Sequence, residues 1–256
     1  MRIKKEKVIF AAVDRKYYRK YAAAWAWSIF QNNMHGHIHV IDPVKKDIKS
    51  LHRLKELTLG HIQFSTGDIK SDLPRDRCYF ASFRFLYLQH LNDLYQKVLV
   101  TDIDSIIRQK VQFPDEDFGF YLREGLKTND NWFAESSKIA AGIFFVNLNK
   151  KNIDRFTYLF NFKLDELQSN NSWRWMVDQN ALFFVFKNIE EDKIFKIHRF
   201  TKKDFSWDFE KLSNIWTGKG ERKHKSPRYL KEFMKYNAGF ILVSWRAFLK
   251  RIISFD

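Results

Sequence analysis

The stretch YQKVLVTDIDSII, residues 95–107, carries the strongest structural signal in this chain. Its apolar run at residues 98–100 is short, continuous and rich in β-branched side chains, as is typical of a strand buried on both faces. Asp102 and Asp104 come directly after this run. Ligands of open α/β sheets gather at the carboxyl ends of strands. The stretch therefore predicts a buried parallel strand with two carboxylates at its functional edge.

On either side of this stretch, strand and helix signals alternate along the chain. Apolar runs rich in β-formers predict strands, and apolar side chains spaced by three and four residues predict helices. The predicted strands cover residues 8–13, 37–41, 62–64, 97–101, 118–122 and 142–147. The predicted helices cover residues 17–30, 48–59, 80–94 and 173–186. This order predicts an α/β domain with a largely parallel sheet and helices on both faces.

The composition excludes several classes of protein. Hydrophobic residues make up 45% of the 256 residues, which is ample for a core, and 9 Gly and 4 Pro are too few for a collagen-like chain. The single cysteine, Cys78, has no internal disulfide partner and excludes a cysteine-based zinc site. No apolar run is as long as a membrane span, so we expect a cytoplasmic protein.

The excess of positive charge is concentrated towards the C-terminus. The chain carries a formal net charge of +15, and residues 216–256 contain ten Lys or Arg and three acids, with Trp and Phe between them. We interpret residues 1–215 as the main domain and residues 216–256 as a basic, helical extension packed on it. Such a surface suits an anionic membrane or lipid-linked glycan, a nucleic acid, or no partner at all. Peripheral contact with a membrane is therefore an open alternative.

Asp102 and Asp104 suit a hard divalent cation. Mn²⁺ or Mg²⁺ is typically held by one or two protein carboxylates, waters and substrate phosphates. The pattern alone is weak, because Asp115 and Asp117 repeat it in a polar turn. A simple turn cap after the strand is the alternative interpretation. The first strand is not followed by G-x-G-x-x-G, which excludes a nicotinamide-type Rossmann site.

The motifs around the Asp pair resemble those of the metal-dependent glycosyltransferases with the GT-A fold, a Rossmann-like fold for nucleotide-diphosphate sugars. The chain is most similar to glycosyltransferase family 8, the glycogenin and lipopolysaccharide galactosyltransferase type. The shared order is YQKVLVTDIDSII, then AAGIFFVNL at residues 140–148, then DQNAL at residues 178–182. The likeness spans residues 8–220.

This resemblance implies an enzyme that moves a sugar, with a hexosyl group from a UDP-sugar as the expected donor. The acceptor would be a saccharide or a lipid-linked glycan. A modified DNA base is the alternative acceptor, and a nucleic-acid-binding protein without enzymatic activity is the second alternative.

The resemblance also implies a role for each matching residue. Asp102 and Asp104 would hold the metal that bridges the donor diphosphate. Asp178 and Gln179 would lie beside the donor sugar as the catalytic pair, the alternative being a helix N-terminal cap. Arg84 would face the diphosphate or sugar, the alternative being a surface ion pair. The other expected donor contacts are Ala11, Ala12 and Asp14 at the nucleoside, Ala141 and Gly142 where a sugar approaches the backbone, and Gly218, Lys219 and Lys223 at the phosphates.

The chain departs from the family at its last motif, H-x-x-G-x-x-K. Aligning the glycine on Gly218 places Ile215 at the histidine position and Glu221 at the lysine position. The basic residues that follow Gly218 still supply positive charge for the phosphates. The third metal ligand is left open among Asn214, His198, His224 and water. The stereochemical outcome, retention in the family, is left open as well.

Overall fold

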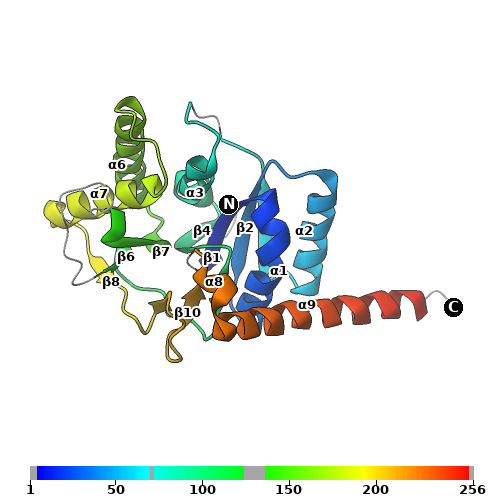
Figure 1. Ribbon diagram of the computed structural model, residues 1–256. Coiled ribbons are helices and arrows are strands. Elements are labelled where there is room, and N and C mark those ends of the chain that lie inside the picture. The colour runs from blue at the N-terminus through cyan, green and yellow to red at the C-terminus, as the bar shows by residue number, and fades with distance from the viewer. Residues whose placement is uncertain (1–4, 70–71, 124–135, 219, 254–256) are drawn as a thin grey trace. The chain divides into compact units, whose positions relative to one another are not determined.

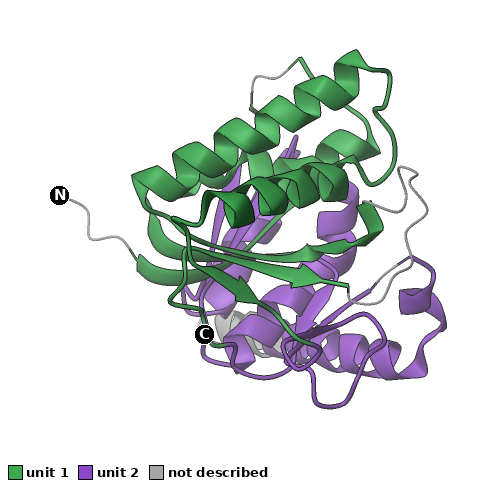
Figure 2. Ribbon diagram, turned by 90° about the vertical axis from the view of Figure 1, so that its left-hand side faces the viewer, with its two compact units in different colours: residues 1–13, 68–102, 112–201 green, residues 14–67, 103–111, 202–256 purple. Residues whose placement is uncertain are grey.

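The computed structural model describes residues 5–69, 72–123, 136–218 and 220–253, with the side chains of these residues described as far as Ser244. The chain forms two compact units (Figure 2), and Figure 1 labels the helices and strands. Unit 1 comprises Met1–Val13, Asp68–Asp102 and Gln112–Thr201. Unit 2 comprises Asp14–Gly67, Ile103–Val111 and Lys202–Asp256.

Unit 1 contains a largely parallel sheet. Its strands, in the order in which they pair, are β1 (Lys5–Asp14), β4 (Tyr95–Thr101), β7 (Ile139–Asn147), β6 (Phe118–Leu122) and β8 (Ile197–Arg199). The β1–β4 and β6–β8 pairs are parallel, and β7 runs antiparallel to both of its neighbours. The side chains at residues 98–100 of β4 are fully buried, which explains the continuous apolar run in the sequence.

Among its described residues, unit 1 has the helices α3 (Arg77–Leu86), α4 (Leu88–Leu91), α6 (Lys150–Ser169) and α7 (Val177–Asp192). Phenylalanine side chains join them to the sheet. The rings of Phe144 on β7 and Phe156 on α6 lie with centroids 4.9 Å apart, and Phe85 on α3 lies 5.2 Å from Phe160. The predicted α/β class, with a largely parallel sheet flanked by helices, is confirmed.

Several helices of unit 1 differ from the sequence prediction, and one of them is α7, which was predicted over residues 173–186 but runs over Val177–Asp192. The helix predicted over residues 80–94 begins earlier, because Asp76 accepts hydrogen bonds from the backbone N–H groups of Cys78 and Tyr79 and so caps α3. It also ends earlier, at Leu86, with the short α4 following it. Helix α6 was not predicted at all, although its buried side chains recur with helical spacing.

Unit 2 combines a parallel strand pair with a small separate sheet. Its elements, in chain order, are α1 (Arg15–Gln31), β2 (Gly36–Ile41), α2 (Lys45–Leu57), β3 (Ile62–Thr66), β5 (Ser105–Ile107), β9 (Phe205–Ser206), β10 (Ile215–Thr217), α8 (Arg222–Lys225) and α9 (Pro227–Ile253). Strands β2 and β3 pair in parallel, and β10 pairs with β5 and β9. The residues that directly follow Asp104 therefore form a strand, β5, and it belongs to the small sheet.

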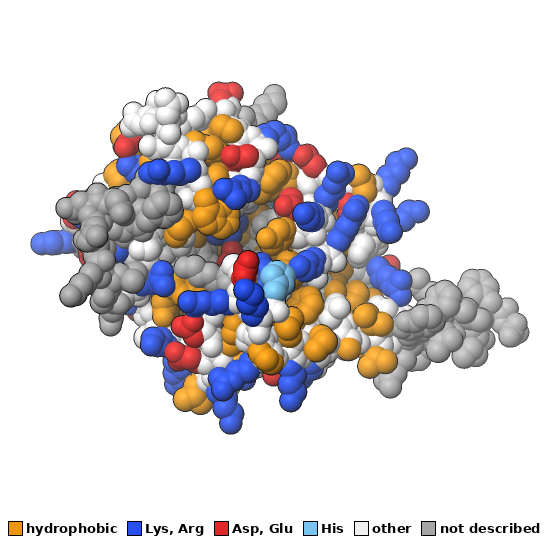
Figure 3. Space-filling model, in the orientation of Figure 1, with side chains coloured by type: hydrophobic (Ala, Val, Ile, Leu, Met, Phe, Trp, Pro, Cys, Tyr) orange, Lys and Arg blue, Asp and Glu red, His pale blue; other side chains and the backbone are white. Residues whose placement is uncertain are grey.

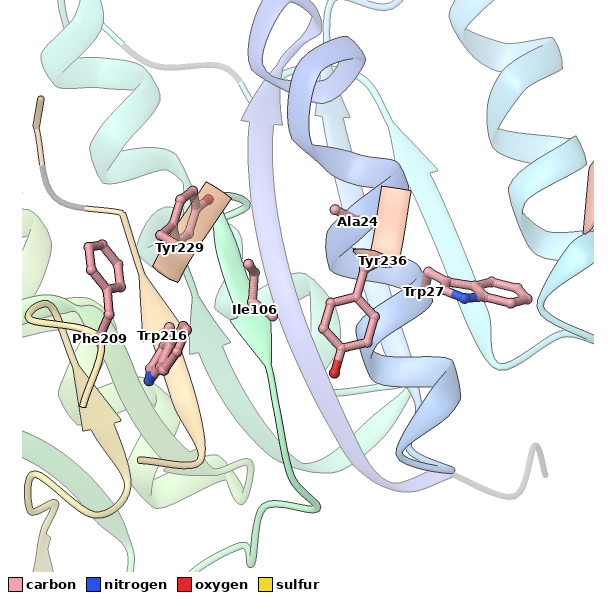
Figure 4. Packing of buried hydrophobic residues seen from close by; sticks show 7 residues of the cluster. All are labelled: Ala24, Trp27, Ile106, Phe209, Trp216, Tyr229 and Tyr236. Carbon is pink, nitrogen blue, oxygen red and sulfur yellow. The ribbon is translucent and has the colours of Figure 1, made fainter. Parts of the chain in front are cut away.

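An aromatic cluster forms the core beneath the small sheet (Figure 4). It brings together α1, β5, β10 and the first half of α9, and its buried members are Ala24, Trp27, Ile106, Phe209, Trp216, Tyr229 and Tyr236. The ring of Phe209 lies 5.1 Å from that of Tyr229 and 5.8 Å from that of Trp216, measured between centroids. This cluster fixes the segments that flank Asp104, Gly218 and Lys223.

The C-terminal part of the chain is helical, as predicted. Helix α9 runs to Ile253 and packs on α1 and α2 (Figure 1). The side chains of the basic segment at residues 245–255 lie outside the described residues. The proposed division between residues 1–215 and 216–256 stays a prediction. None of the described helices is both long and apolar enough to cross a membrane.

Candidate functional site

A buried arginine joins two carboxylates in unit 1. Arg84 Nη1 donates to Asp102 Oδ1 at 2.6 Å, and Arg84 Nη2 donates to Asp178 Oδ2 at 2.8 Å. The ion pair considered as the alternative role of Arg84 is therefore present, but it is buried rather than at the surface, because the side chain of Arg84 is only 10% exposed. Asp102 directly follows strand β4 and its side chain is 28% exposed, which leaves it the most accessible of the three. We call these residues the Arg84 cluster.

Local structure explains how the three side chains meet. Arg84 lies in the last turn of α3, and Asp178 lies in the first turn of α7, where the helix dipole favours a carboxylate. The N-cap of α7 is Met176, whose left-handed backbone (φ 74°) starts the helix without a side-chain cap bond. Asp178 therefore does not occupy the cap position, and its carboxylate binds Arg84 instead.

The surroundings of Asp178 make its ionisation less favourable than it is in water. Burial raises the pKa of Asp178 above its usual value, the Asp102 carboxylate raises it further, and Arg84 opposes both. Removing a charge from water is costly unless a partner compensates for it. Arg84 is that partner, and it serves two carboxylates at once.

The expected sugar contacts lie near the Arg84 cluster along the chain. Gln179 follows Asp178 in α7 and is half-buried, with its backbone N–H donating to Met176. On β7, Ile143 pairs with Thr101, so the next residues of the two strands are Gly142 and Asp102. Ala141 is buried beyond them. The register of the two strands thus places Gly142 next to the position of Asp102.

A second ion pair lies in unit 2. Lys223 Nζ donates to Asp104 Oδ2 at 2.6 Å, and the two side chains are 9% and 7% exposed. The ammonium lies 5.1 Å from the ring centroids of Tyr17 and Tyr21 on α1. The hydroxyl of Tyr229 donates to the backbone oxygen of Asp104 at 2.6 Å. We call these residues the Lys223 cluster.

Lys223 remains an ammonium in this setting. Burial alone would lower its pKa, but the Asp104 carboxylate and the two tyrosines outweigh this and raise the pKa above its usual value. Cation–π contacts add to the attraction when the cation is desolvated. Lys223 and Asp104 therefore form a charged, hydrogen-bonded pair next to the aromatic rings of Tyr17 and Tyr21.

Gly218 makes room for Lys223. A Cβ atom at position 218 would lie 2.5 Å from Cβ and 2.7 Å from Cδ of Lys223, well inside contact distance. The requirement for glycine here comes from this close approach, because Gly218 has no left-handed backbone. Lys219 lies outside the described residues.

We expect Gly218→Ala to destabilise the protein by about 1–3 kcal/mol, because the added methyl must displace the stem of Lys223. Chemical denaturation measures the change. In a Lys223→Ala background the same substitution should cost much less, since the colliding atoms are gone. Equal costs in both backgrounds would contradict the assigned collision.

The residues that we expect at the nucleoside lie at the end of the first strand. Ala11 and Ala12 are buried in β1, and Asp14 is the N-cap of α1, where its Oδ1 accepts from the backbone N–H of Tyr17 at 2.8 Å. Asp14 thus has a structural role as well as the predicted one. The predicted roles of all three at the nucleoside stay predictions.

The Asp pair does not fit a divalent cation in the arrangement described here. Asp102 is bound by Arg84 and Asp104 by Lys223. Ile215 is fully buried in β10 and offers no ligand atom. The described part of the chain has no group of three His, Cys, Asp or Glu side chains placed to hold a metal ion.

The three residues considered as a third ligand are engaged or exposed. Asn214 lies just before β10, where its backbone N–H donates to Lys203. His198 on β8 has its Nδ1 3.8 Å from Glu116, and His224 is exposed on α8. The expectation of Mn²⁺ or Mg²⁺ at the Asp pair stays a prediction without a complete ligand set.

Known structures identify the class of fold. No known family model matches the sequence, and no curated protein does. Solved structures of glycosyltransferases, however, match over nearly the whole chain with TM-scores of 0.61–0.64. The chain therefore has the GT-A glycosyltransferase fold, as the sequence motifs predicted.

Three of these structures illustrate the likeness. GlyE of Streptococcus pneumoniae TIGR4 is 14% identical with a TM-score of 0.64, and the match covers 96% of this chain and 65% of GlyE. The galactosyltransferase LgtC, solved with donor and acceptor sugar analogues, is 13% identical with a TM-score of 0.61 (91% and 95% covered). The bifunctional glycosyltransferase WbbM is 13% identical with a TM-score of 0.64 (95% and 52% covered). This chain thus spans just under two thirds of GlyE and about half of WbbM.

Sequence reasoning missed several members of the Lys223 cluster. Tyr17 and Tyr21 stand four residues apart at the start of α1, which places them on one helix face. That spacing is a usable signal, but it does not say what the face meets. Tyr229 gave no signal, because its contact with Asp104 joins residues 125 positions apart.

Proposed function

We propose that this chain transfers a glycosyl group from a nucleoside-diphosphate sugar to an acceptor, with a UDP-sugar as the expected donor. The observation that carries the proposal is the Arg84 cluster at the carboxyl end of β4, in a fold shared with glycosyltransferases. Carboxyl strand ends are where such sheets bind ligands. The likeness to LgtC, which was solved with donor and acceptor sugar analogues, supports a sugar donor and a saccharide acceptor.

The proposed reaction replaces one bond to the anomeric carbon by another. A hydroxyl oxygen of the acceptor bonds to that carbon, the bond from the carbon to the diphosphate oxygen breaks, and its electron pair leaves with the diphosphate. The acceptor proton passes to solvent or to the departing diphosphate. Fixed positive charge near the diphosphate lowers the barrier, because negative charge grows there.

Each cluster has a proposed task. Arg84 holds Asp102 and Asp178 at set positions, so it is a positioning residue. Asp178 and Gln179 contact the donor sugar, and the backbone at Gly142 allows the sugar to approach. Lys223 faces the departing diphosphate.

The acceptor is proposed to carry negative charge. Lys and Arg side chains dominate over Asp and Glu on the face shown in Figure 3. Helix α9 exposes Lys231 and Lys235 beside the apolar Met234, Ile241 and Leu242. A mixed basic and apolar surface favours a lipid-linked glycan at an anionic membrane. A modified base in DNA is the other acceptor considered.

Donor turnover tests the proposal directly. The purified chain is incubated with UDP-sugars in parallel, and released UDP and thermal stabilisation by UDP are measured. We expect one donor to give release and UDP to raise the melting temperature. The same measurements are repeated with sugar nucleotides of other bases. If no nucleotide is released from any donor and none raises the melting temperature, the chain is not a sugar-nucleotide enzyme. Binding to anionic vesicles and to duplex DNA over a salt series then separates the acceptors, since nucleic-acid binding falls steeply with salt.

We expect Gln179→Ala to lower the rate of UDP release by about 10²-fold, because a group beside the reacting carbon acts in the transition state. UDP binding should be unchanged. The matched control is Asn161→Ala, which removes an exposed amide side chain from α6 and should leave the rate unchanged. Loss of folding in Gln179→Ala would indicate a structural role instead.

A further inference from the structure

The Lys223 cluster is built around one charge. The ammonium of Lys223 is held at 2.6 Å by Asp104, and the Tyr17 and Tyr21 rings lie on its other sides. The backbone of Asp104 is fixed as well, because its carbonyl oxygen accepts a hydrogen bond from the hydroxyl of Tyr229. Side chains this buried and this well oriented form a fixed site, unlike a surface lysine that samples many rotamers.

Three features oppose a divalent cation at Asp104. A metal would have to displace the ammonium from a short, buried contact. Displacement would require the stem of Lys223 to move although it packs directly on Gly218. In the family that the motifs resemble, a histidine completes the metal site. The residue aligned with that histidine here is Ile215, which is fully buried and apolar.

The same features suit a positively charged side chain in place of the metal. An ammonium has three N–H donors, so Lys223 can bind Asp104 and still donate to a phosphate oxygen. A lysine side chain with its ordinary pKa of about 10.4 is already charged at neutral pH. The charge therefore requires no ion from solution and does not vary over the physiological pH range.

We propose that Lys223 takes the place of a divalent cation at Asp104, so that this chain releases the nucleoside diphosphate without a metal ion. The inference rests on the proposed function. When the bond between the anomeric carbon and the diphosphate oxygen breaks, the electron pair goes to the diphosphate. Lys223 stays protonated and stabilises that charge through N–H···O bonds.

Two measurements on the wild-type chain test this inference. UDP release is compared in EDTA and in Mn²⁺, and Mn²⁺ binding is followed by electron paramagnetic resonance without any donor. We expect equal rates within about twofold and no stoichiometric Mn²⁺ binding. Activity that is lost in EDTA and restored by Mn²⁺, or one Mn²⁺ bound per chain, would overturn the proposal.

Variants then assign the charge to Lys223. We expect Lys223→Met to lower UDP release in EDTA by about 10²-fold, the scale of a lost transition-state contact. Lys223→Arg keeps the positive charge, so UDP release should remain resistant to EDTA. This variant tests the proposal if Lys223→Met does not fold. The control is Lys225→Met, an exposed lysine on the same helix, which should behave as wild type. EDTA-resistant release that persists in a folded Lys223→Met would overturn the role of Lys223.

The outcomes separate this inference from the proposed function. If UDP neither binds nor is released under any condition, the function itself is wrong. If UDP is released only with Mn²⁺, the function stands and the inference fails. The resonance measurement needs no turnover, so it tests the site at Asp104 in either case.

Discussion

Arg84→Met is expected to lower the free energy of unfolding by about 3–5 kcal/mol, since removing one partner of a buried ion pair leaves an uncompensated charge. The loss of stability should lie at the upper end of this range, because Arg84 forms ion pairs with both Asp102 and Asp178. Methionine keeps most of the volume, so the loss reflects charge more than packing. Denaturant unfolding followed by circular dichroism measures the change.

The deficit should depend on pH in a defined direction. Burial already raises the pKa of Asp178, and removing Arg84 takes away the charge that opposes this. A carboxyl group with a raised folded-state pKa favours folding while protonated. That contribution is present below the unfolded pKa of about 3.9 and is lost as pH rises through the folded value. The deficit of Arg84→Met should therefore be largest at neutral pH and shrink in acid.

Two controls isolate the charge effect. Arg77→Met removes an exposed arginine from the same helix, where it stacks on Trp175, and should cost less than about 1 kcal/mol. Adding Asp178→Asn to Arg84→Met removes the stranded carboxylate and should recover much of the loss. A deficit that is independent of pH and unchanged by Asp178→Asn would contradict the assignment.

Asp178→Asn alone is expected to separate activity from stability. We expect UDP release to fall by about 10²–10³-fold, because a fixed charge beside the reacting sugar is lost. Stability at neutral pH should stay close to that of wild type. Asparagine can still accept a hydrogen bond from Arg84, and the buried carboxylate whose pKa is raised is gone.

The comparison variant is Asp165→Asn, an exposed carboxylate on α6, which should change neither quantity. Rates are measured as UDP release and stability as the denaturation midpoint. If Asp178→Asn turned over as wild type, Asp178 would be only a partner for Arg84. If it unfolded, the residue would be structural.

The sequence predicted the fold where signals are local. The apolar run of β4 is buried on both faces, so it reads as a strand without knowledge of its neighbours. The start of α3 was missed by three residues because the cap at Asp76 was not weighed. Helix α6 shows that a clear periodic signal can also be overlooked.

The site was harder to predict because its contacts join distant parts of the chain. Asp178 lies 94 residues from Arg84, and Lys223 lies 119 residues from Asp104. The position of the two aspartates after a strand, together with the family resemblance, predicted a metal ion, and nothing in the sequence says that each carboxylate meets a cationic side chain. The alignment on Gly218 even put Glu221, rather than Lys223, at the phosphate position.

Contacts along α9 limit how far the chain could be shortened from its C-terminal end. Tyr229 and Tyr236 are buried in the aromatic cluster, and Arg53 Nη2 donates to the backbone oxygen of Ser244 at 3.2 Å. Between these contacts, Ile241 and Leu242 face solvent. A truncated chain should therefore retain Ser244. Cutting before Tyr229 would remove a wall of the aromatic cluster and the hydroxyl that anchors Asp104.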